Sequence, residues 1–284
     1  MVTAIDGPGP LGYPPFVTSE APILFIGGLG GSGTRAVAGT MMALGYYAGG
    51  CLNGANDNLI FTELFKRPDW IRGSPTPQAI DRRLALFEQV MREGVGAMSM
   101  LRWPALRRFR RQQGRGLVGT PGAIGWMTKE PNCHLFVEPI LERWPDALFV
   151  YVTRHPLDMA YSDNKGQLGN WSWLFDLDPD GFAAPEAAQL EYWIRTQRRL
   201  DGLLARHEGR IYPLNFDAFA ADPVPHVAAL AGRLGLAPDP AALAAATREV
   251  IVPSTVGRWR ERDLSVFTPE QLEFCRRTGW PVDP

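Results

Sequence analysis

Residues 23–35, ILFIGGLGGSGTR, decide the fold that we expect for this chain. The apolar residues 23–26 are followed by glycine, which predicts a short buried strand. Residues 34–44 carry small and apolar side chains and predict a helix that packs on a sheet. Between them, five of the seven residues 27–33 are glycine. Such a loop turns backbone N–H groups inward at a helix N-terminus, so it suits either a bound phosphate or tight packing.

This loop departs from the P-loop of nucleoside triphosphatases at two positions. Thr34 stands in the lysine place of the pattern GxxxxGK[ST], and Arg35 stands in its Ser/Thr place. A nucleoside triphosphatase needs that lysine on the β- and γ-phosphates and that hydroxyl on magnesium. The substitutions therefore argue against a standard enzyme of that class.

Apolar runs and amphipathic stretches alternate in the rest of the chain. We expect strands at 124–128, 147–153 and 210–214, and helices at 136–144, 156–162, 186–206 and 227–234. Strand–helix alternation favours a parallel sheet with its sites beyond the carboxyl ends of the strands. We therefore predict one α/β domain over residues 21–284, with a central parallel sheet flanked by helices. Residues 1–20 are rich in glycine and proline and predict an extended arm.

The composition fits such a domain and excludes several other classes of protein. The chain has 284 residues and a formal net charge of −1, which argues against a generally polybasic, nucleic-acid-coated protein. Cys51, Cys133 and Cys275 are far apart, which favours buried free thiols in a reducing compartment over disulfides or a zinc site. The N-terminus does not have the pattern of a secretory signal, and no apolar run is long enough to span a membrane. We therefore expect a cytoplasmic protein.

Residues 66–115 differ in charge from the rest of the chain. They hold twelve basic residues against four acidic ones. Apolar residues spaced by three and four predict a helix over 81–93, and a second helix is expected over 103–111. The segment has no strand pattern, so we interpret it as a helical insertion or cap of the same domain.

Four segments, in this order, resemble sulfotransferases that use 3′-phosphoadenosine 5′-phosphosulfate (PAPS). Residues 30–35, GGSGTR, are similar to the loop for the 5′-phosphosulfate. Residues 128–131, TKEP, resemble the lysine segment of the carbohydrate and small-molecule branches. Arg154 at a strand end, with Ser162 eight residues later, resembles the motif for the 3′-phosphate. Residues 256–260, VGRWR, look like the late loop that folds over the nucleotide.

The resemblance implies a P-loop-like sulfotransferase fold and in-line transfer of a sulfuryl group from PAPS to a hydroxyl or amine. 3′,5′-Adenosine bisphosphate (PAP) would leave, and no metal would be required. The implied acceptor is a small molecule, a carbohydrate or a lipid-linked natural product. A helix from Pro156 would bring Ser162 to the side of Arg154, and a guanidinium with a hydroxyl suits a phosphate dianion. The implied cofactor-binding residues are Gly30, Gly31, Ser32, Gly33, Thr34, Arg35, Arg154, Ser162, Gly257, Arg258 and Trp259.

One position departs from the family pattern. Many relatives carry Lys or Arg immediately before the Ser-Gly-Thr of the first loop, where this chain has Gly31. The missing cation is expected from Lys129 or Arg35. Lys129 is one of only three lysines in the chain and stands at a predicted strand end, which favours a catalytic role over that of a surface lysine.

The general base has two candidates. His134 follows Lys129 by five residues and has an unperturbed pKa suited to the work. The family also uses a glutamate after the first helix, which Glu63 matches. A structural hydrogen bond for His134 and a salt bridge for Glu63 are the alternatives. We place His134 ahead of Glu63.

Two other functions remain compatible with the residues. A divergent P-loop kinase or nucleotide-dependent transferase would explain the glycine loop, and a polyanion-binding module would explain residues 66–115. In a sulfotransferase the same basic segment predicts an anionic or polyhydroxylated acceptor, or it is simply a solvated helix pair. Flat apolar faces for the acceptor are expected from Trp126, Trp171 and Trp173. No nucleic-acid partner is expected, and the sequence leaves the acceptor and the oligomeric state open.

Overall fold

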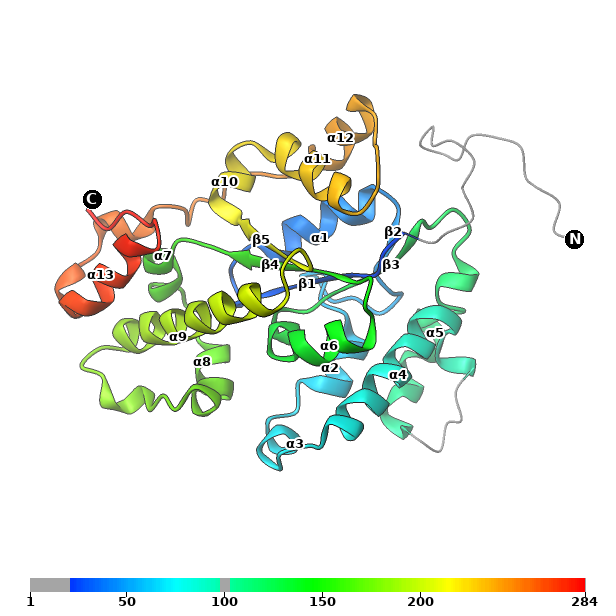
Figure 1. The fold of residues 1–284 in the computed structure, drawn as a ribbon, viewed down its shortest axis with the longest axis horizontal. Helices are drawn as coiled ribbons and strands as arrows, with labels where there is room; N and C mark the ends of the chain where they lie inside the picture. Colours follow the sequence, from blue (N-terminus) through cyan, green and yellow to red (C-terminus); the bar gives the residue numbers. More distant parts are fainter. Residues whose placement is uncertain (1–20, 98–102, 284) are drawn as a thin grey trace, which may run out of the picture.

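The computed structural model describes residues 21–97 and 103–283, so the predicted N-terminal arm lies outside the described residues. A parallel sheet of five strands in the order β2-β3-β1-β4-β5 forms the centre (Figure 1). The strands are β1 (Leu24–Gly28), β2 (Tyr46–Tyr47), β3 (Gly125–Lys129), β4 (Leu148–Thr153) and β5 (Ile211–Asn215). The predicted α/β class with a central parallel sheet is confirmed. The edge strand β2 was not predicted because its two residues carry no periodicity.

Alternate residues of the central strand β1 point to opposite faces of the sheet. Phe25 belongs to one hydrophobic cluster, whereas Leu24 and Ile26 belong to another. All five residues of β1 are buried. Its uninterrupted apolar sequence therefore reflects a strand covered on both faces.

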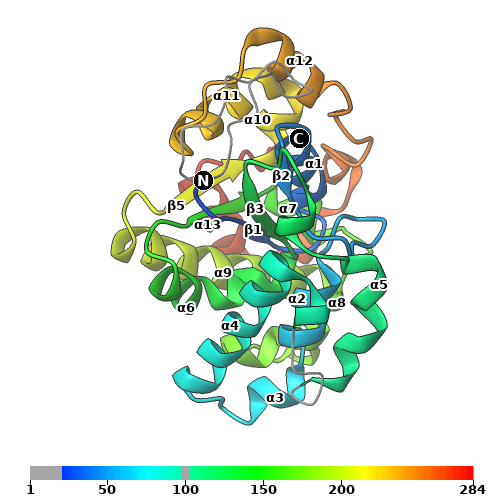
Figure 2. The same cartoon turned by 90° about the vertical axis from the view of Figure 1, so that its right-hand side faces the viewer.

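Helices cover both faces of the sheet (Figure 2). The first face packs against α1 (Thr34–Ala43), α10 (Phe216–Ala221), α11 (Pro223–Arg233) and α12 (Pro240–Thr247). The second packs against α2 (Leu59–Phe65), α4 (Pro77–Glu93), α6 (Val137–Arg143) and the carboxyl half of α9 (Pro185–Arg206). Aromatic rings dominate the second face, where Phe25 contacts Trp126 and Trp144 at centroid distances of 5.8 and 5.2 Å. Cys51, Cys133 and Cys275 are buried free thiols, as predicted.

The basic segment packs its apolar residues against this second face. Leu84, Phe87 and Val90 of α4 join the cluster that contains Phe25. The helix begins at Pro77, earlier than predicted, because the Thr76 hydroxyl accepts the N–H of Ala79 at 3.2 Å and caps it. The other helices of the segment among the described residues are α3 (Pro68–Arg72), the 3-10 helices η1 (Val95–Ala97) and η2 (Pro104–Phe109), and α5 (Arg110–Gln113). The helix expected over 103–111 is thus mainly 3-10, and residues 98–102 lie outside the described residues.

A third cluster lies beyond the carboxyl end of β4. It joins the amino half of α9 to α7 (Pro156–Ala160), α8 (Gly166–Trp171) and α13 (Pro269–Arg277). The helix predicted over 156–162 is shorter than expected, because α7 ends at Ala160 and Tyr161 forms its C-cap. Ser162 therefore follows the helix instead of belonging to it.

Candidate active site

The loop between β1 and α1, residues 29–33, is the predicted phosphate loop. Gly33 has a φ of +94°, a left-handed conformation that suits glycine. A Cβ atom at this position would overlap the ring of Phe216 at the start of α10. Four loop N–H groups have no hydrogen-bond partner among the described residues, those of Gly31, Gly33, Thr34 and Arg35. Unpaired N–H groups at a helix N-terminus favour a bound anion.

The side chains of this loop lie in different environments. Ser32 is 1% exposed, and its Oγ has no hydrogen-bond partner among the described residues. Thr34 is also buried, whereas Arg35 is exposed and forms no ion pair within the described chain. The N–H of Gly30 donates to Oε1 of Gln167 at 2.7 Å. A buried hydroxyl without a partner and an unpaired cation thus flank the open N–H groups.

Arg154 and Ser162 meet at the phosphate loop. Arg154 follows β4, and its Nη1 donates to the carbonyl of Gly31 at 3.2 Å. Its Nη2 donates to the hydroxyl of Thr255 at 2.8 Å. Ser162 Oγ lies 3.7 Å from the place that a Cβ of Gly31 would occupy. The structure therefore brings together the two residues that the resemblance assigned to one phosphate, although α7 is short.

Two aspartates face the guanidinium of Arg154. Asp217 Oδ1 lies 3.7 Å from Nε, and Asp158 Oδ2 lies 4.0 Å from Nη2. Burial lowers the pKa of Arg154 and the two carboxylates oppose that effect. Burial also raises the pKa of Asp217, against hydrogen bonding by the N–H of His155. The charge of Arg154 is therefore balanced by loose ion pairs rather than by a close hydrogen-bonded pair.

Asp158 also holds the late loop. Its two carboxylate oxygens accept the N–H of Gly257 at 2.7 Å and the N–H of Trp259 at 3.2 Å. Arg258 Nη1 donates to the carbonyl of Tyr161 at 3.4 Å, next to Ser162 in the chain. Trp259 is fully buried and stacks on His155 with a centroid distance of 4.9 Å. The ring of Trp259 anchors the loop, and Arg258 lies nearer the predicted phosphate site.

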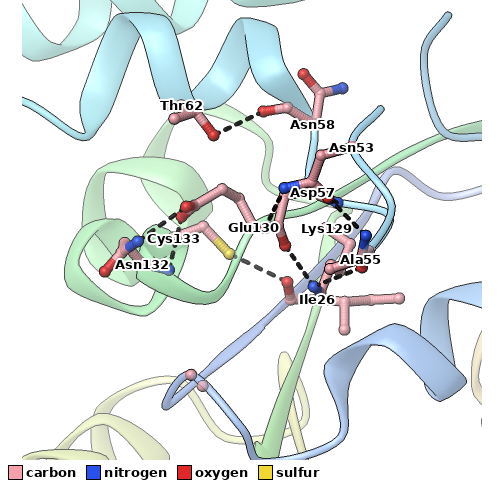
Figure 3. A network of polar contacts seen from close by, with 12 residues as sticks. Ile26, Asn53, Ala55, Asp57, Asn58, Thr62, Lys129, Glu130, Asn132 and Cys133 are labelled. Carbon is pink, nitrogen blue, oxygen red and sulfur yellow. Dashed lines mark hydrogen bonds and ion pairs between the residues drawn. The ribbon is translucent and has the colours of Figure 1, made fainter. Parts of the chain in front are cut away.

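Lys129 lies at the carboxyl end of β3, in register with Ile26 of β1 (Figure 3). Its ammonium forms an ion pair with Asp57 and donates to the carbonyl of Ala55 at 3.0 Å. The side chain of Lys129 is 3% exposed and that of Asp57 is 20% exposed. Asn53 donates to the other oxygen of Asp57 at 2.8 Å. A fixed cation with a partly exposed carboxylate thus stands at the sheet edge beside the phosphate loop.

A chain of hydrogen bonds leads from this edge to the loop. Asn132 donates to Glu130 Oε1 at 2.8 Å, and its own Oδ1 accepts from Gln167 at 2.9 Å and from Trp171 at 2.7 Å. Gln167 then binds Gly30. Burial raises the pKa of Glu130 to about 7, against the hydrogen bonds from Asn132. The network fixes the position of the loop relative to β3.

Glu63 lies on α2 and is 8% exposed. It forms an ion pair with Arg67 and a second one with Arg108 at 2.5 Å. Both carboxylate oxygens are therefore occupied by arginines. The structure does not bring Glu63 to the phosphate loop through any contact, and its role as base stays a prediction.

His134 lies in the 3-10 helix η4 (Pro131–Phe136) and is fully buried. Neither ring nitrogen has a hydrogen-bond partner among the described residues, and the ring meets Tyr151 edge-on at 5.9 Å. Burial, aided by the charge of Arg199, lowers the pKa of His134 to about 3. Its role as base stays a prediction, and the burial of the ring argues against it.

Sequence reasoning missed several residues of this region. Gln167 contacts a residue 137 positions earlier, and Thr255 contacts one 101 positions earlier. No local pattern reveals such pairs. The sequence gives a weak signal for Asp57, since it belongs to the polar stretch 53–58, NGANDN, directly before a helix. The position of Lys129 at a strand end pointed to this edge of the sheet.

The tryptophans expected to face the acceptor differ in burial. Trp126 and Trp171 are 1% and 0% exposed and belong to the core, so the expectation of flat faces there is wrong. Trp173 is only partly buried, with Arg72 above its ring at 5.1 Å.

Residues 21–97 and 103–283 contain no group of three or more His, Cys, Asp or Glu able to hold a metal ion. The same residues include no helix with the length and hydropathy of a membrane span.

Solved structures similar to this chain are sulfotransferases of low sequence identity. The sulfotransferase STF1 from Mycobacterium tuberculosis H37Rv is 16% identical with a TM-score of 0.45, over 81% of this chain and 71% of its own. The sulfotransferase domain of the Synechococcus PCC 7002 olefin synthase is 14% identical with a TM-score of 0.48, over 94% and 98%. The mouse sulfotransferase SULT7A1, solved with PAP, is 12% identical with a TM-score of 0.41, over 93% and 88%.

Sequence comparison gives the family. No curated protein matches the chain significantly. The sequence profile of the sulfotransferase family, in contrast, matches residues 22–240, which is most of the chain and includes the phosphate loop, Lys129, Arg154 and Ser162. The protein therefore belongs to the sulfotransferase family.

Proposed function

We propose that this protein transfers a sulfuryl group from PAPS to a hydroxyl or amine of an organic acceptor by in-line displacement. The observation that carries the proposal is the approach of Arg154 and Ser162 to Gly31, in a loop where four N–H groups have no partner among the described residues. A guanidinium, a hydroxyl and a row of backbone donors suit a nucleotide with phosphate groups at both ends.

The residues present fit PAPS in a specific arrangement. The N–H groups of the loop and the partnerless Ser32 hydroxyl would hold the 5′-phosphosulfate. Arg154 and Ser162 would hold the 3′-phosphate, with Arg258 on the adjoining loop. Because Gly31 supplies no charge, the cation near the bridging oxygen would come from Arg35 or from Lys129. Arg35 has no ion-pair partner among the described residues, whereas Lys129 already balances Asp57. Arg35 is the cation that needs no rearrangement of an existing ion pair.

PAPS would supply the activated sulfuryl group, whose S–O bond to the 5′-phosphate breaks as the acceptor oxygen or nitrogen forms its new bond to sulfur. The leaving electron pair departs with PAP, and the acceptor proton must pass to a base. Asp57 fits this task better than His134 or Glu63. Its carboxylate is partly exposed, and Lys129 and Asn53 fix its orientation at the sheet edge. The loop N–H groups would stabilise charge that develops on the sulfuryl oxygens.

The test uses PAP and labelled PAPS. Arg154→Ala should weaken PAP binding in calorimetry by about 10- to 150-fold, because a charge-assisted hydrogen bond is worth about 1.5–3 kcal/mol. The control Arg248→Ala alters an exposed arginine after α12 and should bind PAP normally. If the parent and Arg154→Ala bind PAP with equal affinity, the assignment of Arg154 to the 3′-phosphate is contradicted. Stabilisation by ATP with magnesium, but not by PAP, would instead favour a kinase-like transferase.

A further inference from the structure

A cavity of about 350 Å³ lies on the second face of the sheet and has no role in the donor site. Eight of its nine lining side chains are apolar, and the ninth belongs to Arg199. Its walls include Ile71 and Ile80 from the basic segment, Leu135 and Phe136 from η4, and Phe175 from the segment before α9. The volume falls in the range of roughly 300–1,000 Å³ that is usual for small-molecule pockets.

Arg199 is the charged residue in the wall of this cavity, and its side chain is partly buried. Its Nη1 donates to the carbonyl of His134 at 2.8 Å, and its Nη2 donates to the carbonyl of Leu135 at 3.0 Å. Burial lowers the pKa of Arg199, and no acidic side chain lies within ion-pair distance in the described chain. Glu138 acts on it from farther away and is itself paired with Arg206 at 2.9 Å. A partly buried cation with no acidic partner within ion-pair distance in the described chain leaves this wall of the cavity positively charged.

The guanidinium retains the donors that an anion needs. Two of its five N–H groups bind backbone carbonyls, and the other three have no partner among the described residues. Three N–H groups are enough for a bidentate hydrogen-bonded ion pair with one carboxylate. A phosphate dianion would instead leave a surplus negative charge in apolar surroundings. The lining therefore favours a carboxylate on an apolar body.

The cavity lies close to the donor site along α9. Thr196 and Gln197 line a small void of about 10 Å³ that is also bordered by Ser32 and Arg154. Arg199 is less than one helical turn further along the same helix, a rise of about 5 Å. The 3-10 helix η4 also connects the cavity to Lys129 at the end of β3. A ligand in the cavity would thus lie near the groups proposed for sulfuryl transfer.

We infer that the acceptor is an apolar carboxylic acid with a distal hydroxyl or amine, whose hydrocarbon body fills this cavity and whose carboxylate pairs with Arg199. The inference rests on the proposed function for the transfer step, but the binding step can be tested without PAPS.

The binding test compares 10-hydroxydecanoate with the neutral 1,10-decanediol by calorimetry on the full chain. The acid should bind the parent more tightly than the diol. Arg199→Met should weaken acid binding at least tenfold and leave diol and PAP binding unchanged. The control Arg198→Met, at the exposed neighbouring position of α9, should bind the acid normally. Equal affinity of the parent for acid and diol, or normal acid binding by Arg199→Met, overturns the inference.

A second variant covers the case in which Arg199→Met does not fold, since Arg199 also holds η4. Ile80→Trp narrows the cavity from α4 and should lower the affinity for the acid at least tenfold, and unchanged affinity overturns the inference. Transfer is then tested with labelled PAPS, where label should enter 10-hydroxydecanoate but not the diol. Acid binding without PAP binding contradicts the proposed function alone. PAP binding with transfer to other acceptors, and none to the acid, contradicts only the acceptor class.

Discussion

Arg154 is buried and Arg199 is partly buried, and their charges are balanced differently. Arg154 faces Asp158 and Asp217 at 4.0 and 3.7 Å. Arg199 donates to the carbonyls of His134 and Leu135 and lines the apolar cavity, with no carboxylate within ion-pair distance in the described chain. Two carboxylates therefore oppose the one guanidinium of the first region, whereas the guanidinium of the second has no carboxylate within ion-pair distance in the described chain.

This difference indicates how each region would treat an anion. A phosphate at Arg154 must compete with two carboxylates that also bind the neighbouring backbone, so its affinity depends on the geometry of the surrounding loops. An anion at Arg199 would displace no protein carboxylate. The charge of Arg154 is therefore balanced by carboxylates of the protein itself, whereas the charge of Arg199 would be balanced by the anion that binds there.

The largest effect is expected where backbone geometry builds the Arg154 region. Gly33→Ala would place a Cβ against the ring of Phe216 at a φ of +94°. Strain and overpacking together should lower the free energy of unfolding by at least about 3 kcal/mol and abolish PAP binding. Urea denaturation and calorimetry measure both quantities.

The matched control is Gly39→Ala, in the interior of the same helix α1. No atom lies within 4 Å of the Cβ that this change would add. Because alanine favours a helix over glycine by about 1 kcal/mol, the control should be slightly more stable than the parent. Equal behaviour of the two variants would mean that the loop is not held in the shape described.

A second, smaller effect is expected at His134, whose carbonyl binds Arg199. The native ring has a pKa of about 3, against 6.5 for an ordinary histidine. Between pH 6.5 and pH 3 the imidazole of His134 is protonated in the unfolded chain but neutral in the native protein. This difference lowers the free energy of unfolding as the pH falls from 6.5 towards 3. At pH 5 the loss amounts to about 2 kcal/mol. His134→Leu should remove that part of the pH dependence in urea denaturation.

Activity of the same variant separates the candidate bases. His134→Leu should keep a near-normal kcat, whereas Asp57→Asn should lower kcat at least about a hundredfold while PAP binding remains. A hundredfold loss in His134→Leu, with normal PAP affinity, would return the role of base to His134. A normal kcat in Asp57→Asn would exclude Asp57.

The two regions were not equally predictable from the sequence. Lys129 and Arg154 were found because apolar runs reveal the strands β3 and β4, and parallel strands present their carboxyl ends at one edge of a sheet. Ser162 and Arg154 both approach Gly31, although the helix expected to carry Ser162 ends at Ala160. Strand ends and glycine turns are local features, so they can be recognised without the fold.

The acceptor side depends on contacts between distant segments. His134 is only five residues from Lys129, yet η4 turns its ring into the core beside Tyr151. Arg199 resembles the other arginines of an amphipathic helix, and only packing shows that no carboxylate meets it. Whether an acidic side chain balances an arginine depends on segments that fold against it, so the spacing of residues along the chain does not predict it.

The smallest expected effect tests the compensation at Arg154 directly. Asp217 lies 3.7 Å from Nε of Arg154 through an oxygen that accepts no hydrogen bond in the described chain, while its other oxygen accepts the N–H of His155. Asp217→Asn can keep the bond to His155 and removes only the negative charge. Without this competitor, PAP should bind about three- to tenfold more tightly, equivalent to about 1 kcal/mol for a loose ion pair. Calorimetry with PAP at low and high salt measures the change, with Asp201→Asn on the exposed side of α9 as the control. Weaker PAP binding in Asp217→Asn would mean that Asp217 serves mainly to orient Arg154. The contrast between Arg154, whose charge is balanced by protein carboxylates, and Arg199, whose charge would be balanced by a ligand, would then not hold.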